Sequence, residues 1–270
     1  MVNKILYILL IITNLFAQIQ KGGFPKFYND RSINLDYIIV DSREENNREF
    51  DARVFQFGDE YEFNLNILEE SQIIENDDES TFIIGVESTG AYGIGFNFSE
   101  FYLTENSKLF LYDENRTFKL GALDLDNNKP SNSLTTTIIK GDRIIIELTV
   151  PNDEIEAVNL RLSSIIHDYT DIMNYHNTLE SNREDCNINV NCPEGDDWED
   201  QINGVVRVTM GGGLCSASIL NNTSNDRTPY ILFADHCVSG SASSYVFHFN
   251  YQSSSCSGTN GSLNQSISGS

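Results

Sequence analysis

The chain has 270 residues, enough for one large domain or two ordinary ones, and its 40% hydrophobic content is sufficient for a folded core. Seventeen basic residues against forty acidic ones give a net charge of −23, which argues against nucleic-acid binding, because attraction to phosphates needs clustered Lys and Arg. Such an acidic excess usually reflects a solvated surface, so it does not indicate a substrate.

Residues 1–17 have the pattern of a secretory signal peptide. Lys4 supplies a positive charge, residues 5–16 form a mostly apolar run, and the small residue Ala17 closes it. A run of this length is too short to span a bilayer, which takes about 20 residues. We therefore predict a secreted protein that is cleaved after Ala17 and is not attached to a membrane afterwards.

Residues 18–50 are polar and uneven, which predicts a leader or linker with one strand at 37–40. From 51 to 167 the chain consists of short strand-like runs separated by acidic or Gly/Asn turns, without sustained helical periodicity. This spacing predicts an antiparallel β-sandwich. Examples of the expected strands are 61–67, 81–86, 93–98, 108–112, 135–139 and 143–150.

Residues 168–185 are polar and weakly patterned, as is typical of an exposed connection between domains. We predict an activation linker here. His167 and His176 lie beside or within it, and both are expected to be surface histidines.

All five cysteines lie in the last 85 residues: Cys186, Cys192, Cys215, Cys237 and Cys256. In a secreted protein this clustering predicts a disulfide-stabilised C-terminal module after a cysteine-free one. Because the count is odd, one cysteine has no partner within the chain.

No cofactor or metal is predicted. The cysteines form no CxxC pair, and nearby His and Asp residues are not spaced as zinc ligands. Asp124, Asp126 and Asn128 resemble the start of a calcium loop, but Lys129 stands where the loop needs glycine and the closing Glu is missing. A plain turn is expected there.

The C-terminal module opens with the cysteine-containing segment 185–196 and continues through an apolar strand at 204–210. A Gly-rich turn and a segment that contains Cys215 follow. After a polar loop, the apolar run "YILF" leads into Ala-Asp-His236-Cys237. A disulfide between the two strands would fix the backbone next to His236. An imidazole held in this way is a candidate general base.

Several ordered segments carry a family resemblance: "CNINVNCPEGD", the Gly-rich turn, "SILNNT", "YILFADHC" and "VFHFNYQSSSC". Together they cover about residues 185–260. They resemble trypsin/chymotrypsin-like serine endopeptidases and, more narrowly, the secreted bacterial lysyl endopeptidases. The preceding β-rich region is similar to the pro-domain of such enzymes, with weaker motifs. The resemblance implies a chymotrypsin-like β-barrel protease domain beginning at residue 186.

The resemblance also implies roles for individual residues. His236 would be the base of a His/Asp/Ser triad that cleaves peptide bonds of a protein substrate, after Lys in this family. The disulfides would be Cys215–Cys237 and Cys192–Cys256. Cys186 would pair with a cysteine far downstream in the family, so it is expected to be unpaired in this chain.

The chain departs from the family pattern at several points. Phe233 replaces a small hydroxyl residue. Asp235 is not expected to be the triad acid, because neighbouring residues of an extended strand point in opposite directions and Asp235 would be badly placed to orient His236. No Gly-x-Ser-Gly segment occurs. Ser216 and Ser218 belong to a packing strand and are not expected to be nucleophiles.

We therefore expect the signal, the pro-region and the incomplete first part of a protease domain (186–270), inactive as given. The alternative is a non-catalytic secreted β-sandwich that binds a surface or glycan and has a degenerate protease-like tail. The sequence leaves the oligomeric state open.

Overall fold

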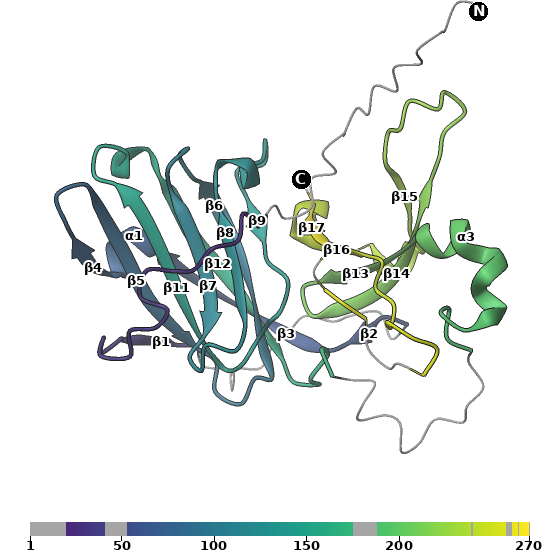
Figure 1. Cartoon of the computed structure of the whole chain (residues 1–270), viewed down its shortest axis with the longest axis horizontal. Helices are drawn as coiled ribbons and strands as arrows, with labels where there is room; N and C mark the ends of the chain where they lie inside the picture. The colour runs from purple at the N-terminus through teal and green to yellow at the C-terminus, as the bar shows by residue number, and fades with distance from the viewer. Residues whose placement is uncertain are drawn as a thin grey trace, which may run out of the picture.

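The computed structural model describes residues 20–40, 53–174, 188–238, 240–257, 261–263 and 265–269. These residues form three β-sheets with antiparallel pairing, apart from one parallel pair at the N-terminal end (Figure 1). The prediction of an all-β protein is confirmed. The predicted signal peptide, Cys186, His176 and most of the predicted linker lie outside the described residues.

Sheets A and C form the predicted sandwich. Sheet A contains, in spatial order, β1 (Tyr37–Ile39), β5 (Glu79–Glu87), β11 (Arg143–Pro151), β7 (Lys108–Asp113) and β8 (Lys119–Leu123), with β4 (Gln72–Glu75) also paired to β5. Sheet C contains β10 (Ile139–Lys140), β6 (Gly93–Tyr102), β12 (Asn159–Asp168) and β3 (Gly58–Asn66), with β9 (Leu134–Thr135) paired to β6. A short helix, α1 (Ile67–Glu70), follows β3.

The sandwich core lies between these two sheets. Alternate side chains of each strand point into it, as the period of two in a β-strand requires. Val86, Phe96, Leu111, Ile146 and Leu162 are among its fully buried members.

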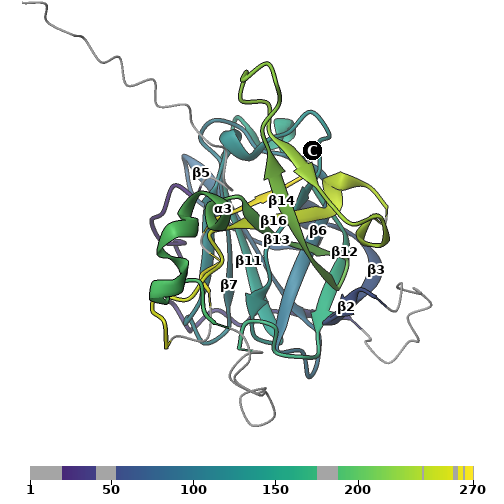
Figure 2. The same cartoon turned by 90° about the vertical axis from the view of Figure 1, so that its right-hand side faces the viewer.

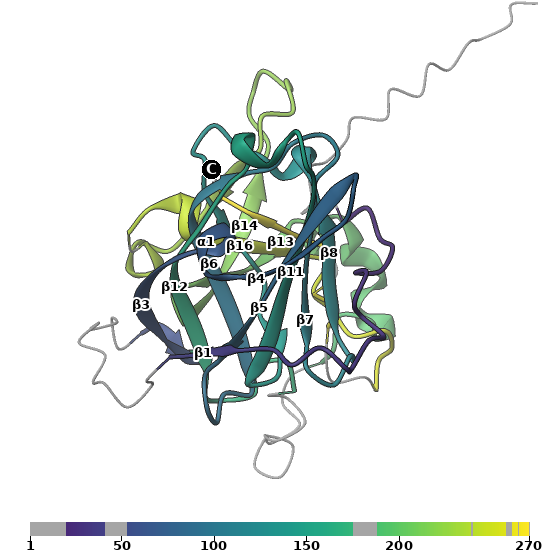
Figure 3. The same cartoon turned by 90° about the vertical axis from the view of Figure 1, so that its left-hand side faces the viewer.

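The described part of the leader, residues 20–40, packs on the outer face of sheet A. Phe27, Tyr28 and Leu35 contact a second apolar cluster that includes Phe110 and Tyr112. Figure 3 shows this sheet from the outside, with the leader crossing it. The predicted strand at 37–40 is observed as β1, whereas the packing of the residues before it was not expected from their uneven polarity.

Sheet B belongs to the C-terminal unit, residues 188–269. Its order is β15 (Tyr230–Leu232), β14 (Gly213–Leu220), β13 (Val205–Met210), β16 (Tyr245–Phe249) and β17 (Ser266–Ser268). The short β2 (Phe55–Gln56), which precedes the sandwich, pairs with β14. Helix α3 (Glu199–Asn203) leads into β13. Within the described residues the sheet is open and does not close into a barrel.

Sheet B stacks on the outer face of sheet C. In Figure 1 its strands lie beside β3 and β12, and in Figure 2, turned by 90°, they lie in front of β6 and β12. Leu214 of β14 shares a cluster with Phe57, Ile138, Ile166 and Ile172 of the sandwich.

The prediction that His167 is a surface residue is wrong. It lies near the end of β12, is only 9% exposed, and has its Nδ1 2.7 Å from the hydroxyl oxygen of Ser88. Burial lowers the pKa of its imidazole. Asp168, where the linker was expected to begin, is the last residue of β12 and is buried.

No helix in the described part of the chain has both the length and the apolar character needed to cross a membrane.

Candidate active site

His236 lies in a short 3₁₀ helix, Asp235–Cys237, two residues after β15. β15 pairs with β14 in antiparallel orientation, with Leu232 opposite Ser218. This pairing fixes the end of β15, from which the turn that carries His236 begins. The backbone N–H of Cys237 donates to the carbonyl of Ala234 at 2.9 Å and closes this turn.

A disulfide joins Cys215 of β14 to Cys237, the residue next to His236. A ring nitrogen of His236 and the two sulfur atoms all lie within 4.8 Å of one another. Because both sulfur atoms are bonded to each other, they are not available as thiolate ligands for a metal ion. Cys237 is buried while the imidazole is half-buried, so the disulfide holds the backbone and leaves the ring accessible.

Phe233 points into the apolar core of sheet B. Its ring makes edge-to-face contacts with Tyr245 and Phe247, with centroids 6.1 and 6.0 Å apart. The residue that departs from the family pattern therefore anchors the strand that leads to His236.

The other polar residues near the motif do not complete a catalytic group in the described structure. Asp235 is exposed, and His236 makes no hydrogen bond to a described carboxylate. Ser216 and Ser218 alternate along β14 with Cys215 and Ala217, which face the core. Their side chains therefore lie on the opposite face of the sheet from the disulfide.

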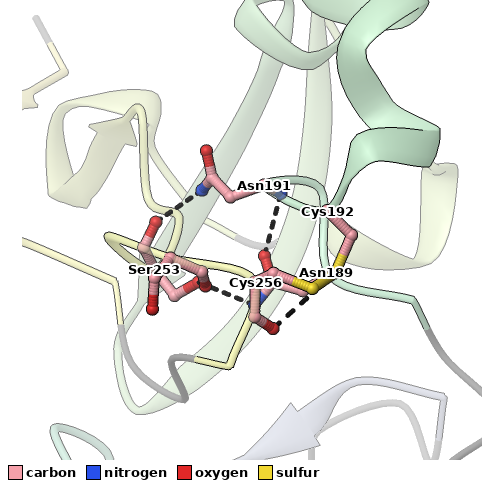
Figure 4. The surroundings of a disulfide bond; sticks show 6 residues. Asn189, Asn191, Cys192, Ser253 and Cys256 are labelled. Carbon is pink, nitrogen blue, oxygen red and sulfur yellow. Dashed lines mark hydrogen bonds between the residues drawn. A yellow bond between two sulfur atoms is a disulfide. The ribbon is translucent and has the colours of Figure 1, made fainter.

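A second disulfide joins Cys192 to Cys256 (Figure 4). Around it, the side-chain amides of Asn189 and Asn191 donate to the hydroxyl and the carbonyl of Ser253. This bond fixes the start of the C-terminal unit to the loop after β16, 64 residues later in the chain. The two disulfides are the pairs that the family resemblance implied.

Sequence reasoning did not single out Arg207 or His248, which lie opposite each other on β13 and β16. The His248 Nε2 is 3.3 Å from the Thr209 hydroxyl oxygen, and the Arg207 guanidinium lies 4.2 Å from the centre of the Tyr251 ring. Burial, and secondarily the charge of Arg207, lower the pKa of His248 to about 3. The sequence signal was limited to polar residues alternating with apolar ones, which is typical of any half-exposed strand.

The C-terminal unit is similar to a known protein family. Residues 181–270 match the family model described as "Lysyl endopeptidase, C-terminal domain". The matched segment contains His236 and both disulfides.

Proposed function

We propose, on the premise that residues 181–270 belong to the lysyl endopeptidase family, that the protein is the precursor of a secreted serine endopeptidase. The observation that carries the proposal is His236, which lies within the matched segment beside a disulfide and is only partly buried. The sandwich would be the pro-domain of this enzyme, and Lys the residue after which it cleaves. Both of these assignments rest on the family.

In the proposed mechanism, His236 takes the proton of a serine hydroxyl as that oxygen attacks the peptide carbonyl. It then donates the proton to the leaving amine. The ring must therefore contact both the nucleophile and the substrate, and its partial exposure supports this role. The disulfide restricts where the ring can point, which preserves the geometry needed for proton transfer.

The nucleophile and the acid are not assigned to any of the 270 residues. The sequence contains no Gly-x-Ser-Gly segment, and Ser216 and Ser218 lie on the face of sheet B away from the disulfide. We therefore propose that these 270 residues alone do not form an acyl-enzyme.

The test uses the product of the complete gene, assayed on a lysyl ester and on a peptide that contains a single Lys. We expect His236→Gln to lower kcat by roughly 10⁴-fold or more with KM little changed, because a general base acts in the transition state. Asp235→Asn is the matched control and should leave kcat unchanged, since Asp235 is exposed. Full activity of the His236→Gln enzyme would refute the role of this residue.

A further inference from the structure

The two faces of sheet B differ in chemistry. Val206, Val208, Met210 and the aromatic residues of β16 form the core on one face. On the other face, the strand pairings place Leu214, Thr209, Val246 and Ser268 in one row across four strands. A neighbouring row contains Ser216, Arg207, His248 and Ser266. We call these two rows the polar face.

Most of the polar face is buried although it carries hydroxyl, imidazole and guanidinium groups. Thr209, Val246, His248, Ser266 and Ser268 are between 1% and 7% exposed. The sandwich contacts the first row at both ends, through the apolar cluster at Leu214 and through Lys129 at Ser268. The sandwich therefore covers a surface whose composition is that of a solvated strand face.

Besides the apolar cluster at Leu214, the two units are joined by backbone and polar contacts. The N–H groups of Phe57 and Gly58 donate to the Gly212 carbonyl at 2.8 and 3.2 Å, and β2 adds a strand to β14. The Lys129 ammonium donates to Ser268 and to the carbonyl of Gly269 at 2.8 Å. Interfaces of this polar kind are typical of partners that also exist apart.

The junction is also incompletely packed. A pocket of about 630 Å³ lies there, and its lining includes Phe55 and Ile172 from the sandwich side together with Arg207 and Ser216 from sheet B. Nδ1 of His248 and Nε of Arg207 are buried without a hydrogen-bond partner among the described residues. Buried polar groups without a partner destabilise the closed interface, and they are solvated again when the interface opens.

We propose that the sandwich is a separable partner of the C-terminal unit. After the chain is cut between residues 174 and 188, the sandwich stays bound to the polar face of sheet B at neutral pH and separates from it in mild acid. This inference concerns binding between the two units, and it does not depend on whether the complete protein hydrolyses peptides. Both described disulfides lie within the C-terminal unit and do not join it to the sandwich.

The acid sensitivity follows from His248, which contacts Thr209 in the row beneath the sandwich. A histidine with a pKa of about 3 in the closed pair and the ordinary value of 6.5 after separation takes up a proton on release. The stabilisation of the closed pair is therefore present above pH 6.5 and lost as the pH falls. At pH 5 the pair would be weakened by up to about 30-fold.

Other charged groups surround this part of the interface: Arg207 and Tyr251 from the C-terminal unit, and Asp168, Glu60 and Lys129 from the sandwich. Arg207 opposes protonation of His248 while the pair is closed. Burial raises the pKa of Asp168, so acid favours its buried form and partly offsets the effect of His248. Burial lowers the pKa of Lys129 to about 8, and it therefore stays largely protonated between pH 5 and 7.5.

The test uses the full chain with Cys186→Ser, to exclude thiol exchange, and with a site for a sequence-specific protease inserted after residue 178. After cutting, size-exclusion chromatography and titration calorimetry compare pH 7.5 with pH 5.0. We expect the fragments to co-elute at pH 7.5 and the dissociation constant to rise by up to about 30-fold at pH 5.0. Circular dichroism of each fragment at pH 5.0 distinguishes separation from unfolding.

His248→Gln removes the titrating group and keeps a side chain able to reach Thr209. Its dissociation constant should not rise at pH 5.0. His167→Gln is the control, because His167 is also buried but lies in the sandwich and contacts Ser88. It should keep the acid response of the parent chain. Folded fragments that separate at pH 7.5, a pair equally tight at both pH values, or an unchanged acid response in His248→Gln would each overturn the proposal.

A measurement on the uncut chain gives a second readout if a fragment fails to fold. Protection of the Phe57 and Gly58 amides against hydrogen exchange, corrected for the intrinsic rate, should fall at pH 5.0. Amides of the β5–β11 pair should keep their protection. Equal protection of the interface amides at both pH values would contradict acid release.

Discussion

Glu147 of β11 is completely buried on the outer side of sheet A, beneath the leader. Its carboxylate accepts hydrogen bonds from the Tyr112 hydroxyl at 2.8 Å and from the Phe27 backbone N–H at 3.3 Å. Burial nevertheless raises the pKa of this carboxyl, and these hydrogen bonds only partly counter the effect. The side chain thus joins the leader to the sheet while favouring its protonated form.

We predict that Glu147→Gln removes a loss of stability that the parent chain undergoes as the pH rises. A raised carboxyl pKa in the folded state gives stability that is present in acid and lost as the pH rises through that pKa. The free energy of unfolding of Glu147→Gln, measured by urea denaturation, should therefore increase relative to that of the parent as the pH rises from 4.5. Glu62→Gln, at an exposed position, should follow the parent chain. A parallel pH profile for Glu147→Gln and the parent would contradict the assignment.

For single residues, the sequence predicted the strands that carry them better than it predicted their burial. It predicted the strand at 143–150 but not that a glutamate within it is buried, because the covering residues 20–40 have the composition of a linker. His167 was assigned to the surface for a similar reason, since the polar residues after it suggested exposure. In the structure, its packing against Tyr61 and its contact with Ser88 bury it.

Among the elements, the turn between β13 and β14 determines how closely the two units approach. Gly212 has φ of +92°, and a Cβ at this position would lie 2.1 Å from the Gly58 carbonyl oxygen. The same turn accepts the hydrogen bonds from Phe57 and Gly58. A glycine is therefore needed both for the backbone conformation and for the contact.

We predict that Gly212→Ala destabilises the chain more than Gly90→Ala does. Gly90 has a similar φ of +84° but nothing within 4 Å of the added Cβ, so its substitution reports the conformational cost alone, about 1–2 kcal/mol. Gly212→Ala should cost roughly 1–3 kcal/mol more because Gly58 must move. Thermal unfolding of both variants measures the difference, and equal melting temperatures would show that the turn is not under steric constraint.

The strands were predicted well where alternation is regular and poorly where pairing is interrupted. Residues 135–139 were expected to form one strand but are divided between β9 and β10, because the Thr136 hydroxyl accepts the Phe96 N–H in place of a backbone ladder bond. β12 was missed. Its register shifts between Leu162 and Ser164, and this irregularity breaks the period of two on which strand prediction depends.

For the whole molecule, the anchored residues limit where the proposed precursor can be cut. The Asp168 carboxylate accepts the N–H groups of Thr170 and Ile172, each at 2.9 Å, and Ile172 is buried. On the other side, Cys192 is held by its disulfide. A protease needs an extended segment that can leave the fold, so the segment between these two anchors is the expected site.

We predict that N-terminal sequencing of the mature protein finds an end between residues 175 and 187, with the bond after Arg183 as the first candidate. Arg183→Gln should slow the conversion of the precursor, followed by gel electrophoresis, whereas Arg161→Gln in β12 should not. A mature end inside the sandwich would contradict the proposed activation linker.

Strand spacing, cysteine distribution and the resemblance at the C-terminal end predicted a sandwich followed by a protease-like module. They did not predict the stacking of sheet B on sheet C. Thr209, His248 and Ser268 have the composition of a solvated face, and nothing local in the sequence indicates that another sheet covers them. Only the three-dimensional contacts identify this face as an interface.

The order of the two units along the chain also bears on the order in which they fold. β12, the last strand of sheet C, ends at residue 168, and β13 begins 37 residues later at residue 205. A growing polypeptide folds its N-terminal domain first. The cysteine-free sandwich needs no oxidant, so it can be complete before Cys215 and Cys237 are synthesised. The sandwich would then offer sheet B a folded surface to pack against before either disulfide closes.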